Sequence, residues 1–242
     1  MLYAYAFNLF PIKRDNKLLE LIIFDCDGVL VDSEPLSARA TATALSEFGI
    51  QMDQKTALRL FTGITVDDAM AVIKDLYGIQ LPPEYLSRKA ELVDYEFRHY
   101  LKPVPGITDL LPQLDIPVCV GSNSLHARLK VTLDTTGLAP FFIDQVYSAE
   151  DVSRGKPAPE LFLHAASRNN VAPENCLVID DSPTGIIAAV AAGIPVVGFT
   201  GGTHAGPELP EKLRSHGANW IMNSHQDVTQ LINTLLDTRI AS

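Results

Sequence analysis

Two aspartates stand directly after a short apolar run. Asp25 and Asp27 follow the run 21–24, and Gly28 comes next. An apolar run of this length, bounded by a turn-forming residue, is typical of a buried strand. Alternate residues of an extended chain face the same way, so both carboxylates could face one site. Two acids so placed are costly unless a cation or hydrogen-bond donors lie close by. A plain turn at Asp27-Gly28 is the competing interpretation.

Two further polar clusters also follow apolar runs. Ser122-Asn123 ends the run 116–121, and Asp180-Asp181 ends the run 176–179. Ligands of open α/β sheets bind beyond the carboxyl ends of the strands, so clusters that are distant in sequence can meet at one edge. Lys156, placed just before a proline, is the cation that would join them.

These residue types suit phosphoryl transfer. Carboxylate oxygens, with few nitrogen or sulfur donors, favour Mg²⁺. Asp25 is a suitable nucleophile because carboxylates can form an aspartyl-phosphate. Asp27 could protonate the leaving alcohol and then activate water. Ser122 and Lys156 would hold the phosphoryl oxygens.

The elements that must position these residues fall into two kinds. From residue 104 onward, strands alternate with helices, which predicts a parallel sheet covered on both faces. Residues 35–103 show only helical periodicity, interrupted by glycines. We therefore expect an α/β fold: a Rossmann-like three-layer α/β/α core with a parallel sheet, made of residues 18–34 and 104–242, plus an inserted helical cap domain. Residues 1–17 form an N-terminal extension of unknown role.

Within the core, the pattern predicts the following order of elements. The expected strands are 116–120, 145–147, 176–179, 195–199 and 220–222, and the expected helices are 107–114, 125–136, 159–169, 185–192 and 226–236. The glycine-rich segment 201–206 follows a strand but lacks the spacing of a dinucleotide fingerprint. We expect it to be a mobile connection.

Composition excludes several partners. The chain has 242 residues, 47% of them hydrophobic, and a formal net charge of -10. Such a charge argues against nucleic-acid binding, which depends on neutralising phosphates. No apolar run approaches the length needed to cross a bilayer, so no membrane partner is expected. Three widely spaced cysteines in or beside apolar runs suggest reduced, buried thiols and a cytoplasmic location.

Four motifs, in order along the chain, resemble those of the haloacid dehalogenase-like hydrolases. They are Asp25-x-Asp27-Gly28-Val29-Leu30-Val31-Asp32-Ser33, Ser122-Asn123, Lys156-Pro157 and Asp180-Asp181-Ser182-x-x-Gly185. The resemblance covers the chain from about residue 18 to at least 199. It is strongest to the subgroup with a helical cap that holds β-phosphoglucomutase and many bacterial sugar phosphatases.

The resemblance implies a role for each matching residue. Asp25 would be the nucleophile and a Mg²⁺ ligand, and Asp27 the acid/base and a ligand through its backbone carbonyl. Asp181 would be the third protein ligand, with Asp180 adjacent to it.

The phosphate contacts follow in the same way. Ser122 and Lys156 would bind phosphate, and Asn123 and Glu34 are further candidates for contact with substrate. The substrate would be a small phosphorylated metabolite such as a sugar or sugar-acid phosphate. The sequence does not determine the oligomeric state, and a monomer is favoured.

Single residues separate the chemistries of this family. The dehalogenases and the phosphonatase branch lack a carboxylate at the position of Asp27. Mutases of the β-phosphoglucomutase type carry a histidine where this chain has Ser37, and a cap arginine where Val66 follows Gly63-Ile64-Thr65. Phosphatase is therefore preferred, with a phosphosugar mutase as the alternative.

Two classes of protein other than an enzyme fit parts of the pattern. A phospho-aspartate signalling module also combines acids, a Ser/Thr and a lysine, but there the acidic pair comes early in the chain and no cap is inserted. A binding protein that has lost catalysis is disfavoured by the intact motifs. Lesser candidates for contact with substrate are the loop histidines and helix arginines, namely His126, His204, Arg39, Arg59 and Arg128.

Overall fold

A single six-stranded sheet forms the centre of the computed structural model, which describes residues 18–237. The strand order is β3-β2-β1-β4-β5-β6, and every neighbouring pair is parallel. The strands are β1 (Leu21–Phe24), β2 (Val118–Ser122), β3 (Val146–Ser148), β4 (Cys176–Asp180), β5 (Val196–Phe199) and β6 (Trp220–Met222). β1 pairs with β2 on one side and β4 on the other, so the polar ends of these three strands are adjacent.

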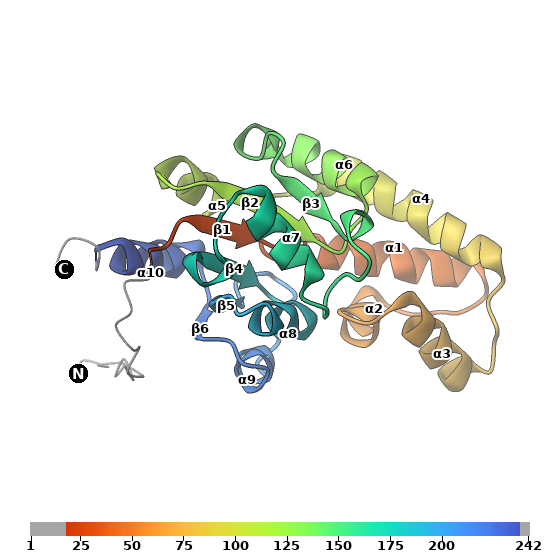
Figure 1. Ribbon diagram of the computed structural model, residues 1–242. Coiled ribbons are helices and arrows are strands. Elements are labelled where there is room, and N and C mark those ends of the chain that lie inside the picture. The colour runs from red at the N-terminus through yellow and green to blue at the C-terminus, as the bar shows by residue number, and fades with distance from the viewer. Residues whose placement is uncertain (1–17, 238–242) are drawn as a thin grey trace, which may run out of the picture.

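Helices cover both faces of the sheet, which gives the three layers expected from the sequence (Figure 1). One face carries α7 (Glu160–Arg168), α8 (Pro183–Ala191) and α9 (Leu209–Ser215), and the other carries α5 (Ile107–Leu110), α6 (His126–Thr136) and α10 (His225–Asp237). Because both faces are covered, β1, β4 and β5 are buried along their whole length. Short 3₁₀ helices complete the core: η1 (Leu111–Gln113), η2 (Ala139–Phe141), η3 (Ala149–Asp151) and η4 (Pro173–Asn175).

The first four helices after β1 form a separate helical unit: α1 (Glu34–Glu47), α2 (Gln54–Phe61), α3 (Val66–Tyr77) and α4 (Pro83–Tyr100). Figure 1 shows them grouped beyond the carboxyl ends of the strands. They have a small apolar core of their own, which includes Leu45, Ile73 and Tyr85. α4 also packs against α6, one of the helices that cover the sheet. The boundaries at residues 34/35 and 103/104 stay a prediction, and the predicted extension 1–17 lies outside the described residues.

Several boundaries differ from the sequence-based expectation. The helix expected over 107–114 is α-helical only to Leu110 and continues as η1, where Pro112 lacks the N–H that an α-helix requires. β2 begins and ends two residues later than expected, so Ser122 belongs to the strand itself. α9, one of the helices that cover β5 and β6, was not anticipated.

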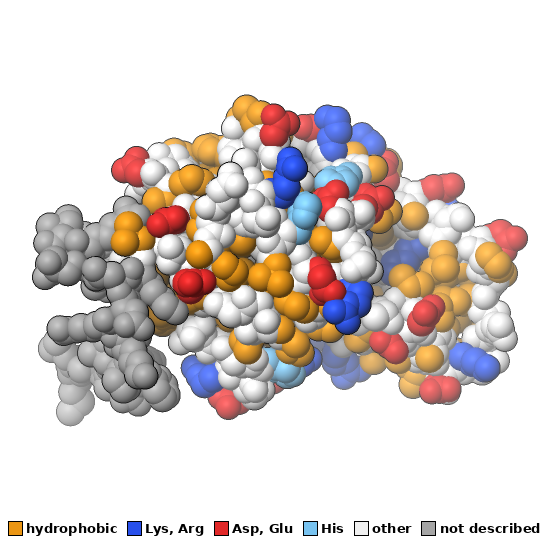
Figure 2. All heavy atoms as spheres, in the orientation of Figure 1, with side chains coloured by type: hydrophobic (Ala, Val, Ile, Leu, Met, Phe, Trp, Pro, Cys, Tyr) orange, Lys and Arg blue, Asp and Glu red, His pale blue; other side chains and the backbone are white. Residues whose placement is uncertain are grey.

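The surface and the thiols bear on the partners that the composition suggested. On the face shown in Figure 2, basic side chains are interspersed with acidic ones. No helix within residues 18–237 combines the length and apolarity needed to cross a membrane. Cys26, Cys119 and Cys176 are free and buried, and burial raises the pKa of each thiol.

Candidate active site

Three carboxylates meet where β1 and β4 end. One oxygen from each of Asp25, Asp180 and Asp181 lies within 4.8 Å of the others, and all three residues are buried. Asp25 directly follows β1, and Asp180 is the last residue of the neighbouring strand β4. The adjacency of these strands therefore brings together residues that are about 155 positions apart in the sequence.

Lys156 is buried against two of these carboxylates. Its Nζ donates to Asp25 Oδ1 at 2.8 Å and to Asp180 Oδ2 at 2.7 Å, and its side chain is 3% exposed. Burial alone would lower the pKa of Lys156, but Asp180 and Asp25 outweigh it and raise that pKa. Nζ also lies 4.9 Å from the centre of the Phe162 ring. Lys156 is therefore held as a cation against the carboxylates.

Asn123 fixes the backbone of that lysine. Its Nδ2 donates to the carbonyl of Lys156 at 2.9 Å, and its Oδ1 accepts from the N–H of Lys156 at 2.8 Å. Both polar atoms of the Asn123 side chain are thus engaged with the backbone, so they position Lys156. The predicted contacts of Asn123 and Ser122 with phosphate stay predictions; Ser122 is buried at the end of β2, where its Oγ accepts from the Ser124 N–H.

Asp180 is held by the start of α8. Its Oδ1 accepts from the backbone N–H and the hydroxyl of Ser182, and Ser182 in turn caps α8 by accepting from the N–H of Gly185. A Cβ at position 185 would lie 1.9 Å from Asp180 Oδ2, so only glycine fits there. The Asp-Asp-Ser-x-x-Gly motif therefore describes a strand end joined to a capped helix.

The charges of this cluster favour an additional cation. Burial, offset by Lys156 and reinforced by Asp180 and Asp181, raises the pKa of Asp25 well above its usual range. Burial likewise raises the pKa of Asp181. Lys156 contacts two of these buried carboxylates and His204 the third, so at most two positive charges face three carboxylates and the cluster is short of positive charge. The donor set, which consists of carboxylate oxygens, fits a hard divalent ion such as Mg²⁺.

Asp27 faces a different set of partners. Ser124 Oγ donates to Asp27 Oδ2 at 2.8 Å, and Arg128 lies 3.5 Å from Asp27 Oδ1. The guanidinium of Arg128 also lies over the ring of Phe97 on α4, 4.6 Å from its centre. Although burial opposes it, the charge of Arg128 lowers the pKa of Asp27. The two aspartates thus have pKa values shifted in opposite directions.

Two groups near Asp27 come from the helical unit. Burial and the charges of Asp27 and Asp181 raise the pKa of Glu34, at the start of α1, to about 7. Lys89 on α4 is half-buried, and burial together with Arg128 lowers its pKa. No hydrogen bond or ion pair joins Lys89 to another residue of the described chain. No motif or spacing marked Lys89 as a candidate, whereas Ser124 lies beside the predicted Ser122-Asn123 cluster.

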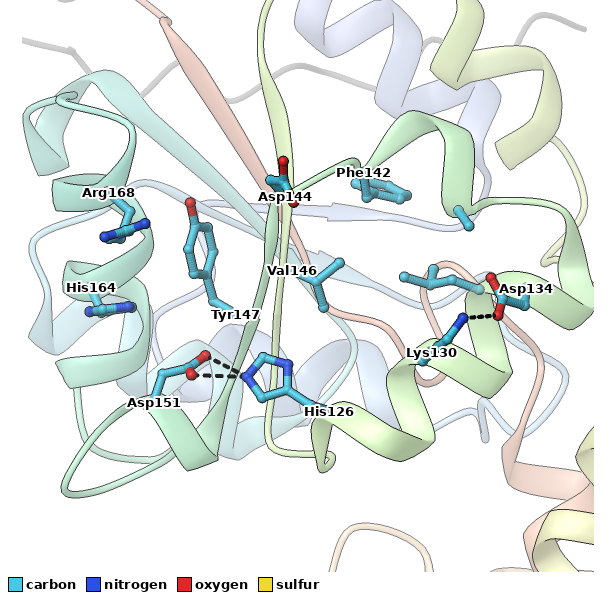
Figure 3. Close-up of a pocket in the computed structure, with 12 residues that line it drawn as sticks. His126, Lys130, Asp134, Phe142, Asp144, Val146, Tyr147, Asp151, His164 and Arg168 are labelled. Atoms are coloured by element: carbon cyan, nitrogen blue, oxygen red, sulfur yellow. Dashed lines mark hydrogen bonds and ion pairs between the residues drawn. The ribbon is translucent and has the colours of Figure 1, made fainter.

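The remaining candidates lie in different places. His204 contacts Asp181, as described below, whereas His126 pairs with Asp151 at 2.9 Å. His126 lines an open groove of about 1050 Å³ at the β3 edge of the sheet, between α6 and α7 (Figure 3). Arg39 pairs with Glu96 within the helical unit; Arg59 is exposed on α2.

That groove is separate from the aspartate cluster. None of the residues that line it is one of the strand-end aspartates. Its charged side chains include two internal ion pairs, His126 with Asp151 and Lys130 with Asp134 (Figure 3). The chemistry-bearing residues, and not the groove, therefore define the candidate active site.

The fold and the site define a parallel α/β protein whose acid cluster lies at the carboxyl edge of the sheet, where such proteins bind their ligands, with a helical unit beside it. Residues 22–199 match the family described as "Haloacid dehalogenase-like hydrolase", and this chain belongs to that family.

Two named phosphatases and a solved structure are similar to this chain over most of its length. The 6-phosphogluconate phosphatase of Escherichia coli (strain K12) is 32% identical over 200 residues, covering 81% of this chain and 89% of that protein. The fructose-1-phosphate phosphatase of the same organism is 35% identical over 179 residues, covering 73% and 94%. The crystal structure of a haloacid dehalogenase-like protein of unknown function from Agrobacterium tumefaciens str. C58 superposes with a TM-score of 0.83 at 36% identity, covering 90% of this chain and 99% of that one.

Proposed function

We propose that this protein is a Mg²⁺-dependent phosphatase that hydrolyses a small phosphorylated metabolite through an aspartyl-phosphate on Asp25. That it is a phosphoric monoester hydrolase follows from its family and from relatives named as phosphatases. The observation that carries the proposal is the buried cluster in which Lys156 contacts Asp25 and Asp180 beside Asp181.

Asp25, Asp181 and the backbone carbonyl of Asp27 would hold the ion. Asp180 is already engaged by Lys156 and Ser182, so it would support the site from behind. A bound Mg²⁺ would neutralise charge on the phosphoryl oxygens and favour the ionised form of nearby carboxylates. The pKa of Asp25 is raised in the absence of an ion, which favours its protonated form. Attack on phosphorus requires the ionised carboxylate, and a bound cation would favour that form.

The residues would act in two steps. An oxygen of Asp25 forms a bond to phosphorus while the bond between phosphorus and the ester oxygen breaks, and Asp27 gives a proton to the departing alkoxide. In the second step Asp27 takes a proton from water, whose oxygen attacks phosphorus and releases Asp25. Ser122 and Lys156 would hold the phosphoryl oxygens in both steps. Arg128, which lowers the pKa of Asp27, favours the ionised form that takes a proton from water in the second step and disfavours the protonated form that the first step uses.

The substrate would be a sugar or sugar-acid phosphate. Two relatives are named for such substrates, 6-phosphogluconate and fructose 1-phosphate. Lys89 and Arg128 add two positive charges on the side of the site nearest the helical unit. These charges favour a substrate with a second anionic group, such as a sugar acid. Closure of the helical unit over the substrate would exclude bulk water from the reaction.

The phosphosugar mutase stays the second candidate. It requires a second phosphate to be recognised from the cap, and this chain has Ser37 and Val66 where the resemblance to mutases would require histidine and arginine. Arg88 and Arg98 of α4 pair with acidic residues of the helical unit, so Lys89 is the cationic side chain of α4 that the site would have to use instead. Failure of glucose 1,6-bisphosphate to support isomerisation of a sugar monophosphate would favour the phosphatase.

The test is a panel of phosphorylated metabolites assayed with Mg²⁺, using wild type and two variants. Asp25→Asn should reduce turnover by at least about a thousandfold, because the carboxamide is a poor nucleophile. Asp27→Asn should allow slow phosphorylation of Asp25 but block release, so an acid-stable phosphoprotein of increased mass should accumulate. Asp134→Asn, at an exposed ion pair on α6, is the matched control. Undiminished turnover by Asp25→Asn would refute the proposal.

A further inference from the structure

The loop that follows β5 is fastened to the active site. Thr203 donates twice to Asp32, from its N–H to Oδ1 at 3.1 Å and from its hydroxyl to Oδ2 at 2.6 Å. Asp32 lies in the turn between β1 and α1, 171 residues away in the sequence. The segment 201–206, which the sequence suggested was a mobile connection, is thus tied to the turn from which the helical unit emerges.

His204 extends from this loop to a carboxylate of the cluster. Its Nε2 lies 2.9 Å from Asp181 Oδ2, and the two side chains are only 6% and 8% exposed. Burial would lower the pKa of His204, but the hydrogen bond and charge of Asp181 outweigh it and raise that pKa. Because Nε2 faces a carboxylate oxygen, which only accepts, it is the ring nitrogen placed to carry the hydrogen and donate, and Nδ1 is buried without a partner among the described residues.

Two glycines fix the geometry of this contact. A Cβ on Gly28, whose φ is +80°, would lie 1.8 Å from Asp181 Oδ2 and 3.0 Å from the His204 ring. A Cβ on Gly202 would lie 2.7 Å from two atoms of the same ring. Asp181 Oδ2 is therefore confined between the backbone of Gly28 and the imidazole of His204, and the imidazole is itself confined by Gly202.

We propose that His204 is a positioning residue for the ion site: its Nε2–H holds Asp181 Oδ2 so that the other carboxylate oxygen is presented to a divalent cation. This inference rests on the proposed function, in which Asp181 is an ion ligand. Hydrogen bonds that orient a metal-binding side chain are typically worth 10–100-fold in metal affinity. The loop after β5 thus contributes to the ion site without supplying a ligand to it.

The inference is tested by Mn²⁺ affinity, measured as the loss of the EPR signal of free Mn²⁺ on titration with protein. His204→Ala should weaken Mn²⁺ binding by about 10–100-fold. His204→Gln should stay within a few-fold of wild type, because its amide nitrogen can donate from nearly the same place. His126→Ala is the matched control: it removes an equally short contact from histidine to aspartate outside the aspartate cluster, and Mn²⁺ affinity should not change. Thermal unfolding of each variant verifies that it is folded.

Asp181→Asn separates failure of the inference from failure of the proposed function. If Asp181→Asn loses Mn²⁺ while His204→Ala binds as wild type does, or more tightly, the inference is overturned and the proposed ion site stands. His204→Gln as weak as His204→Ala would also overturn it, since a donor at this position would then not be what Asp181 requires. If Asp181→Asn binds Mn²⁺ like wild type, the ion site itself is wrong and the inference falls with it.

Discussion

At the scale of single residues, Lys156 stabilises the buried carboxylates of Asp25 and Asp180. Burying a carboxylate costs desolvation free energy, which is offset only when the group is paired and hydrogen-bonded. Lys156 contacts Asp25 and Asp180 with a side chain that is 3% exposed, and the contacts of Asn123 with its backbone hold it there. Removing this cation would leave two buried carboxylates without their positive partner.

Lys156→Met should therefore lower both stability and activity. Breaking a buried ion pair on one side typically costs 3–5 kcal/mol, so we expect the free energy of unfolding to fall by roughly that amount in metal-free urea titrations. Added Mg²⁺ should recover part of the loss, because it supplies positive charge to the same carboxylates. Lys130→Met removes an exposed pair with Asp134 and should change stability by under about 1 kcal/mol. Equal stability of Lys156→Met and wild type would contradict this account.

The second residue-scale prediction concerns Asp27. Arg128 lowers the pKa of Asp27, and Asp27 must be ionised to act as base. Arg128→Gln should raise that pKa, so the acidic limb of the kcat profile should move to higher pH. A rise of one unit corresponds to roughly a tenfold loss of rate on the acidic side. Lys130→Gln removes a charge from the same helix and should leave the limb in place. An unchanged limb in Arg128→Gln would show that Asp27 does not depend on this cation.

At the scale of elements, the site could be predicted because its residues are the last residues of strands. Alternation of strands and helices implies a parallel sheet, and a parallel sheet brings strand ends to one edge. Asp25 and Asp180 therefore meet at one edge, and Ser122 ends the neighbouring strand β2. Lys89 and the contact of His204 with Asp181 could not be predicted, because they depend on how α4 and the loop after β5 fold back across the sheet edge. Sequence periodicity predicts helices and strands but does not predict where α4 or the loop after β5 lies relative to the sheet edge.

α10 fastens the turn after β1 through a buried histidine. His225, 1% exposed at the start of α10, lies with Nε2 2.9 Å from the carbonyl oxygen of Val29 and stacks on the ring of Phe199 at 4.6 Å. Burial lowers the pKa of His225 to about 4. This residue therefore stays neutral in the folded protein and gains a proton on unfolding at mildly acidic pH.

The expected result is a specific pH dependence of stability. Because the pKa of His225 is about 4 when folded and about 6.5 when unfolded, its contribution is complete above pH 6.5 and is lost as pH falls toward 4. The full loss amounts to roughly 3.5 kcal/mol at about 1.4 kcal/mol per pKa unit. His225→Gln should be less stable at pH 7 but should lose less between pH 6.5 and 4 in urea unfolding. An equal loss in wild type and variant would exclude His225 as the source.

At the scale of the whole molecule, the helical unit and the sheet layer meet around the site. α4 packs against α6, and the guanidinium of Arg128 on α6 lies over Phe97 of α4 while also facing Asp27. The chain carries a formal net charge of -10 and yet places Lys89 and Arg128 together at this junction. Asp27 and Glu34 offset part of the repulsion between these two cations, and a further anion beside Lys89 would offset more of it.

Lys89→Gln tests whether that anion belongs to the substrate. If Lys89 faces the far end of a sugar-acid phosphate, the variant should raise KM for that substrate by about tenfold, the value of one charge-assisted contact. KM for the phosphate of a sugar without a carboxylate should change little. The kcat should be retained for both substrates, because the contact is the same in the ground state and the transition state. Lys74→Gln, on α3 of the same helical unit, is the control for loss of a positive charge. An equal rise in KM for both substrates would mean that Lys89 acts on closure of the helical unit and not on substrate charge.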